Sequence, residues 1–129
     1  MSEDKKVVVM FVDDEEKVLR GLESMLFDHD DRWEMRFYNI AQEALKEMSD
    51  DQVSILVTDI QMPEMNGVEL MKKVREEYPS VYCIALTGEA KKENLQSILD
   101  LADKLLDKPC SEKVLVGTLS QAEEKIQAS

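Results

Sequence analysis

The sequence lacks the features that mark several large classes of protein. Its 28 acidic residues outnumber 16 basic ones, which gives a net charge of −12. This charge opposes nonspecific binding to nucleic acid, because such binding depends on cationic contacts to phosphate. No apolar stretch is long enough to span a bilayer, and no secretory signal follows Met1. We therefore expect no direct contact with nucleic acid or membrane, and a cytoplasmic location.

Cysteine and histidine are also scarce. The two cysteines, Cys83 and Cys110, have neither metal-ligand spacing nor a disulfide framework, so we interpret both as reduced and Cys83 as a core residue. The only histidine, His29, lies in the acidic segment 28–31. We expect this segment to be a loop, with His29 solvated and without a partner. The eight methionines are spread over apolar faces and are interpreted as packing.

Apolar runs alternate with helical patterns along the 129 residues. The runs predict strands at 7–12, 33–38, 53–58, 81–86 and 104–107. Apolar residues at helical spacing predict helices at about 18–27, 41–48, 68–78, 95–102 and 111–126, the last with Ser111 as its N-cap. This alternation predicts an α/β fold, a flavodoxin-like doubly wound five-stranded parallel sheet in the order 2-1-3-4-5 with five helices. Without repeats or linkers, we expect residues 1–129 to form a single domain with its core at about 6–127.

Polar side chains follow four of the predicted strands. Asp13 and Asp14 end the first strand, Asp59 the third, Thr87 the fourth and Lys108 the fifth. Because the carboxyl ends of parallel strands meet at one edge of the sheet, we expect these side chains to converge at the point where the strand order reverses. A buried carboxylate is costly to desolvate without a counter-charge or a chemical role.

Each of these residues also has a simpler interpretation. A single Asp before a loop with proline commonly caps the turn, which would explain Asp59. Lys108 alone is better interpreted as a surface charge paired with Asp107. The occurrence of four such signals with the same polarity favours a common site.

Three neighbouring carboxylates raise one another's pKa unless a cation joins them. Mg²⁺ is the natural choice, since it prefers oxygen ligands and no His or Cys is near. We expect Asp14 and Asp59 to bind it directly, Gln61 through its backbone carbonyl, and Asp13 through a water or by orienting the others.

A carboxylate, a magnesium ion, a lysine and a hydroxyl are the parts needed to form an aspartyl phosphate. Phosphoryl transfer requires mainly in-line positioning and stabilisation of charge on the phosphoryl oxygens. We therefore predict that Asp59 is the nucleophile and phosphoacceptor, and that Lys108 and Thr87 hold the phosphoryl group.

With these residues in place, the chain from about 6 to 126 resembles a response-regulator receiver domain of two-component signalling. The resemblance rests on Val12-Asp13-Asp14-Glu15, Asp59-Ile60-Gln61-Met62-Pro63-Glu64-Met65-Asn66-Gly67, Leu86-Thr87-Gly88 and Leu106-Asp107-Lys108-Pro109. It implies that a sensor histidine kinase or a histidine phosphotransfer protein donates a phosphoryl group to Asp59 with Mg²⁺ bound. It also implies a cis bond between Lys108 and Pro109.

The resemblance assigns further roles. Ile60 and Gly88 complete the expected phosphate-binding set, and Gln61 and Glu89 are at the positions that tune hydrolysis of the aspartyl phosphate. Receivers usually have Tyr or Phe three residues before the lysine, and this ring turns inward as the Thr hydroxyl moves. The position is Leu105 here, so we expect a switch that depends on Thr87, the loop after it and the fourth helix.

We also consider other classes of function. A Mg²⁺-dependent phosphatase of the haloacid-dehalogenase type would have its second acid two residues after the nucleophile, but the acidic pair here is adjacent. A scaffold that works without phosphorylation would have no use for the acid, Thr and Lys set. We expect a protein that is not an enzyme, either free-standing or excised from a longer chain. Its output would pass to a downstream protein target or a fused output domain, with a possible homodimer through the fourth helix, fifth strand and fifth helix.

Overall fold

Strands and α-helices alternate throughout the part of the chain described by the structure, a computed structural model that covers residues 6–62, 65–88 and 92–128. The strands are β1 (Val7–Val12), β2 (Trp33–Tyr38), β3 (Ile55–Asp59), β4 (Tyr82–Thr87) and β5 (Lys104–Asp107). The helices are α1 (Glu16–Met25), α2 (Ala41–Asp51), α3 (Gly67–Glu77), α4 (Lys92–Leu101) and α5 (Glu112–Ala128). All strand pairs are parallel and the order is β2-β1-β3-β4-β5, which confirms the predicted fold.

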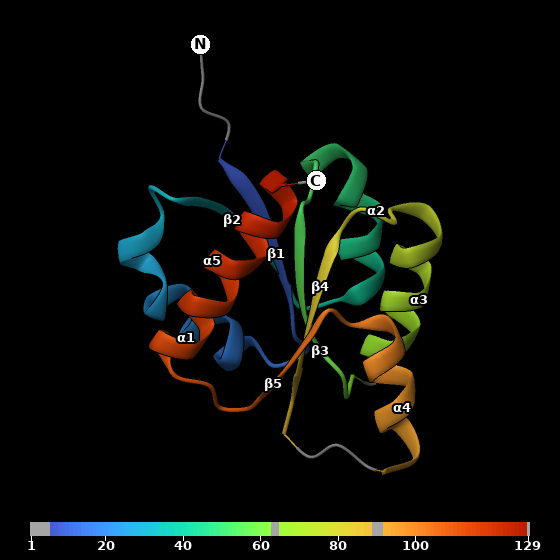
Figure 1. The fold of residues 1–129 in the computed structure, drawn as a ribbon. Helices are drawn as coiled ribbons and strands as arrows, with labels where there is room; N and C mark the ends of the chain where they lie inside the picture. Colours follow the sequence, from blue (N-terminus) through green and yellow to red (C-terminus); the bar gives the residue numbers. More distant parts are fainter. Residues whose placement is uncertain (1–5, 63–64, 89–91, 129) are drawn as a thin grey trace.

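The sheet lies between two layers of helices (Figure 1). Helices α1 and α5 cover one face, where their leucines pack on Phe11, Val57 and Ile84. Helices α2, α3 and α4 cover the other face and pack on Met10 and Leu56. Because both faces are covered, β1 and β3 are apolar without alternation. None of the described helices is both long and apolar enough to cross a bilayer.

Several element boundaries differ from those predicted. Strands β3 and β4 each end one residue later than expected, at Asp59 and Thr87, because Asp59 still pairs with Leu86 in the ladder. Helix α2 runs on to residue 51, and Gln52 ends it in a left-handed conformation with φ 54°. Because Asp59 is the last residue of β3 and still pairs with Leu86, its backbone is held more firmly than that of a residue in a loop.

Helices α3 and α5 begin with side-chain caps. The Asn66 side chain accepts a hydrogen bond from the Glu69 amide at 2.9 Å, and the Glu69 carboxylate accepts one from the Asn66 amide at 3.3 Å. This reciprocal capping box starts α3 directly after the loop from β3. The Ser111 hydroxyl accepts from the Val114 amide at 3.2 Å, which confirms the predicted cap of α5.

The prediction of a solvated His29 is wrong. Residues Phe27–His29 form a short 3-10 helix, and the ring of His29 contacts Trp33 at a centroid distance of 5.9 Å. Nε2 of His29 lies 3.2 Å from a carboxylate oxygen of Glu112 on α5. Trp33 itself is fully buried and donates from Nε1 to Glu123 at 3.2 Å. His29 therefore contacts α5, whereas Asp28, Asp30 and Asp31 are exposed and residues 30–31 form a turn, as expected of a loop.

Candidate functional site

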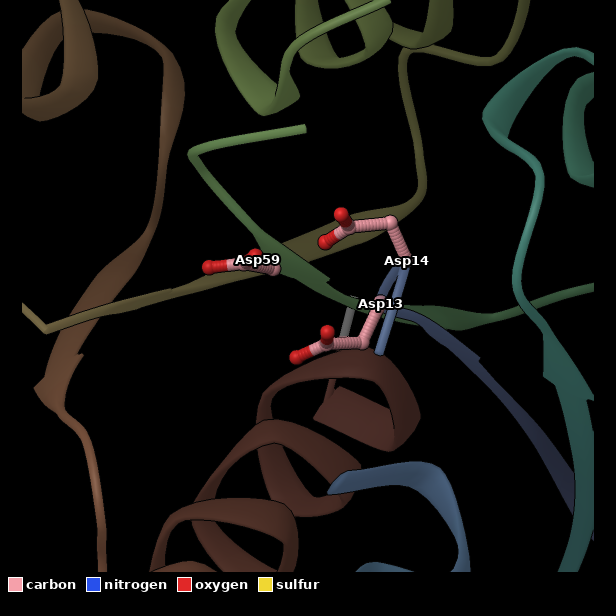
Figure 2. A group of neighbouring side chains, drawn as sticks. All are labelled: Asp13, Asp14 and Asp59. Atoms are coloured by element: carbon pink, nitrogen blue, oxygen red, sulfur yellow. The ribbon is translucent and has the colours of Figure 1, made fainter. Parts of the chain in front are cut away.

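Three carboxylates meet at the carboxyl edge of the sheet. Asp13 and Asp14 follow β1, and Asp59 is the last residue of the neighbouring strand β3. Figure 2 shows the three side chains pointing toward the same side of this edge. One carboxylate oxygen from each residue lies within 4.8 Å of the others. The predicted convergence is therefore confirmed, and it follows from the placement of β1 beside β3.

Asp13 is fixed from three directions. Its backbone amide donates to the Tyr38 carbonyl at 3.1 Å, Oδ1 accepts from the Glu15 amide at 2.9 Å, and Oδ2 accepts from Nζ of Lys108 at 3.0 Å. The side chain is only 1% exposed. By contrast, Asp14 is exposed, and among the described residues its carboxylate has no hydrogen-bond partner. With its side chain fixed and buried, Asp13 is suited to orient the other acids. The exposed carboxylate of Asp14 is suited to bind a metal ion directly.

Asp59 is held through its backbone. The hydroxyl of Thr58 donates to the Asp59 carbonyl oxygen at 2.9 Å, and this oxygen lies against Gly67 at the start of α3. A Cβ atom on Gly67 would overlap the Asp59 carbonyl and lie 2.9 Å from Cα of Ile60. The Gly67 amide also donates to the Ile60 carbonyl at 2.9 Å. Gly67 therefore permits α3 to begin in contact with the end of β3.

Lys108 supplies the positive charge of the site. Its Nζ lies 3.0 Å from Oδ2 of Asp13 and 3.4 Å from Oδ1 of Asp59. The Lys108 amide donates to the Thr87 carbonyl at 2.9 Å, and the bond between Lys108 and Pro109 is cis, as the resemblance implied. The alternative of a surface lysine paired with Asp107 is wrong, because the side chain reaches back over the sheet edge to the acids.

The charges of the cluster shift two pKa values. Burial raises the pKa of Asp59, and the negative charges of Asp13 and Asp14 raise it further, against the opposing effect of the Lys108 ammonium. Burial alone would lower the pKa of Lys108, but its hydrogen bond to Asp13 and the charges of both acids outweigh burial and raise it. One ammonium faces three carboxylates, so negative charge remains in excess. This excess of negative charge makes the three acids a candidate site for a cation.

The remaining predicted residues lie around this cluster. Thr87 is buried at the end of β4, beside β3, and Gly88 follows it at the same edge. The Ile60 amide already donates to the Leu86 carbonyl at 3.2 Å, so a contact with a phosphoryl group would require this bond to break. Gln61 is exposed directly after Ile60. Glu89 lies outside the described residues.

Leu105 lies three residues before Lys108, at the position where receivers usually have Tyr or Phe. It is half-buried on β5 and packs against the apolar cluster on the α2, α3 and α4 side of the sheet. Its ladder partner is Ala85 on β4, two residues before Thr87. The residue is therefore close in the ladder to the predicted phosphate-binding Thr, with a flexible aliphatic side chain in place of a ring.

Comparison with known proteins identifies a family. Residues 9–120 match the response regulator receiver domain. The chain is 30% identical over 120 residues to the uncharacterized transcriptional regulatory protein YesN of Bacillus subtilis, covering 88% of this chain and 31% of YesN. It is also 30% identical over 107 residues to a protein-glutamate methylesterase/protein-glutamine glutaminase of Pseudomonas savastanoi, covering 81% of this chain and 30% of that protein. The chain thus spans about a third of the length of these relatives.

Solved structures agree with this assignment. The chemotaxis protein CheY4 of Vibrio cholerae is 26% identical with a TM-score of 0.83, covering 92% of this chain and 99% of CheY4. The signal receiver domain of an HD domain-containing protein from Pseudomonas fluorescens Pf-5 has the same fold, with a TM-score of 0.90 at 24% identity, covering 97% of this chain and all of that domain. The chain belongs to the response regulator receiver domains of two-component systems.

Proposed function

We propose that this receiver domain accepts a phosphoryl group on Asp59. The observation that supports the proposal best is the placement of a buried carboxylate next to one lysine and two further acids at the open edge of the sheet. A structural ion pair needs one acid for each base, whereas this cluster retains excess negative charge. Such an excess costs stability and is retained where a cation and a charged reactant bind.

In the proposed reaction an oxygen of Asp59 forms a bond to phosphorus as the bond from phosphorus to the donor's imidazole nitrogen breaks. The nitrogen keeps the electron pair and takes up a proton from water. Lys108 moves its contact from Oδ1 of Asp59 to a phosphoryl oxygen while it keeps its hydrogen bond to Asp13. The Thr87 hydroxyl donates to another phosphoryl oxygen. These groups stabilise the charge that spreads over the phosphoryl oxygens in the transition state.

The acidic cluster fits a magnesium ion. Its ligands are hard carboxylate oxygens within 4.8 Å of one another, and the three negative charges face one ammonium, which supports the binding of a further cation. Asp14 and Asp59 would hold the ion with the Gln61 carbonyl, and Asp13 would orient them. When bound, the ion neutralises negative charge on the acids and the phosphoryl group.

The partners follow from the family. We propose a sensor histidine kinase or a histidine phosphotransfer protein as donor, in the cytoplasm, and a downstream protein or a fused output domain as receiver of the signal. Support for fused domains comes from the relatives, of which this chain matches only about a third. We propose that the domain is a switch and not an enzyme, that Gln61 and Glu89 tune its lifetime, and that α4, β5 and α5 form its face for partners or a second copy.

The test is the intact mass of the protein after incubation with MgCl₂ and acetyl phosphate, on wild type and on Asp59→Asn. We expect one phosphoryl adduct that is labile to base, disappears with EDTA and is absent from the variant. Asp107→Asn is the matched control, since Asp107 is an exposed acid at the end of β5, and it should behave as wild type. An adduct in Asp59→Asn would refute Asp59 as the phosphoacceptor, and no adduct in wild type even with a phosphorylated histidine donor would favour the phosphorylation-independent scaffold.

A further inference from the structure

Strand β5 carries Lys108 to the acidic cluster, although little apolar packing holds this strand in place. It is a four-residue strand at the edge of the sheet and, among the described strands, pairs with β4 alone. Only Leu106 of its four residues is buried, and the first and last are exposed. A shift of one residue along β4 would move Lys108 by about 3.3 Å and turn its side chain to the other face. The contacts of Lys108 with Asp13 and Asp59 therefore require a fixed register.

Asp103, the residue before β5, fixes this register at the amino end of the strand. Its backbone amide donates to the Cys83 carbonyl at 2.8 Å, and its Oδ2 accepts from the Cys83 amide at 2.8 Å. The backbone and the side chain of one residue thus bind both backbone groups of a single residue of β4. If β5 shifted by one residue, Ala102 or Lys104 would lie opposite Cys83, and neither side chain can accept a hydrogen bond from its amide.

Arg75 on α3 holds the Asp103 carboxylate in the orientation that this contact needs. Its Nη2 lies 2.6 Å from Oδ2 of Asp103, the same oxygen that accepts from Cys83. The other guanidinium nitrogens donate to the carbonyl of Leu101, the last residue of α4, at 2.9 Å and to the carbonyl of Val81, just before β4, at 3.0 Å. The planar guanidinium therefore joins α3 to the end of α4, the start of β4 and the residue before β5. Lysine offers a point charge without this fixed fork.

We propose that Arg75 and Asp103 are positioning residues: together they fix the register of β5 and so place Lys108 at the acidic cluster. The pair lies at the amino end of β5, and Lys108 follows its carboxyl end, about 16 Å away along the extended chain. Loss of the pair leaves every side chain of the acidic cluster in place but frees β5 to shift along β4. The effect on phosphoryl transfer rests on the proposed function, whereas the fixing of β5 does not.

Amide hydrogen exchange of the full chain tests whether the pair fixes β5. The reporter is the Lys108 amide, which donates to the Thr87 carbonyl at 2.9 Å, just past the carboxyl end of the ladder. Because Arg75→Met also lowers the overall stability, the control must lower it without touching β5. Met48→Ala meets this need, since it removes a buried side chain from α2, which packs on β1 and β2.

The two variants are compared at urea concentrations that give them the same free energy of unfolding. We expect the Lys108 amide to exchange at least about tenfold faster in Arg75→Met than in Met48→Ala. The amide of the buried Leu56 on β3 should exchange equally in both. Asp103→Ala should behave as Arg75→Met does, and the milder Arg75→Lys should show a smaller difference of the same sign. Equal exchange of the Lys108 amide at equal stability overturns the proposal, since the pair would then support only the overall stability.

The effect on the reaction is tested by the initial rate of adduct formation from acetyl phosphate and MgCl₂, without urea, where every variant is folded. A displacement of about 1 Å at a reacting group costs about 10²-fold in rate, so Arg75→Met and Asp103→Ala should each react at least about tenfold more slowly than Met48→Ala. The double variant should be no slower than the slower single variant, because both residues act through one strand. Equal rates in Arg75→Met and Met48→Ala, or losses that multiply in the double variant, overturn the positioning role. If no adduct forms even in wild type, the proposed function fails, while hydrogen exchange still decides whether the pair fixes β5.

Discussion

Replacing Gly67 by alanine should displace the phosphoacceptor without touching any side chain of the site. The added Cβ atom would overlap the carbonyl oxygen of Asp59 and lie 2.9 Å from Cα and 3.0 Å from Cδ1 of Ile60. Two of these three atoms belong to the backbone, so no rotamer change relieves the overlap. The Asp59 carbonyl is also bound by the Thr58 hydroxyl, which limits how far it moves alone. The start of α3 and the end of β3 must therefore separate.

The size of the effect follows from two opposing contributions. Overpacking at a closely packed contact costs about 1–3 kcal/mol, and the gain in helix propensity from Gly to Ala is about 1 kcal/mol or less. We expect a net loss of up to about 2 kcal/mol in the free energy of unfolding. The effect on phosphoryl transfer should be larger, because a displacement of about 1 Å at a reacting group costs about 10²-fold in rate.

Unfolding in urea, followed by fluorescence of the buried Trp33, gives the first quantity, and intact mass after timed exposure to acetyl phosphate gives the second. Gly117→Ala is the control, since its Cβ meets no atom within 4 Å. It should stabilise the protein by about 0.5–1 kcal/mol and leave the rate unchanged. The reasoning is refuted if the Gly67 variant matches this control in both measurements.

Three further predictions concern charge and burial. Asp59→Asn should raise the free energy of unfolding at pH 7 without metal, because burial and the neighbouring acids raise the pKa of Asp59 in the folded protein. The gain should shrink as the pH falls through this raised pKa and vanish well below about 3.9, the pKa of an unfolded aspartate, where the acid is protonated in both states; a gain that grew instead would contradict this sign. Iodoacetamide at pH 8 should modify Cys110 alone in the folded protein and both thiols in urea, because Cys83 is enclosed and burial raises the pKa of its thiol to about 11. Peptide masses identify the modified thiol, and labelling of Cys83 in the folded protein would refute its burial. Arg75→Met should lower the free energy of unfolding, measured in urea, by about 3 kcal/mol, because the guanidinium binds Asp103 at 2.6 Å together with two backbone carbonyls. Arg75→Lys should restore only part of this stability, and full restoration by lysine would show that charge alone matters.

The strand-end acids could be predicted because they depend on local pattern. Each apolar run shows where a parallel strand ends, and the strand order then determines which ends are neighbours. This reasoning places Asp13 and Asp59 together with no knowledge of any side-chain contact. It fails by one residue at the ends of β3 and β4, because the run of apolar residues stops before the ladder does.

Contacts between distant elements could not be predicted in this way. The helix was predicted to begin at residue 68 and no cap was assigned to it, but Asn66 and Glu69 form a capping box that the local spacing Asn-x-x-Glu could have revealed. The contact of Gly67 with Asp59 has no local signal, since it depends on how α3 approaches the sheet. The same is true of His29, whose partner Glu112 lies 83 residues away.

The stability of Asp59→Asn bears on more than electrostatics. A cluster of three acids around one lysine is a poor way to stabilise a fold, because the desolvation of the charges exceeds what a single ammonium returns. The strand ends do not need these charges to be held in place. The backbone amide of Asp13 and the backbone carbonyl of Asp59 form hydrogen bonds that uncharged side chains at these positions would leave intact. If Asp59→Asn makes the protein more stable and unable to accept a phosphoryl group, the unfavourable charge of Asp59 is retained for the reaction. A bound cation and transfer of the phosphoryl group to Asp59 would then relieve the repulsion among the three acids.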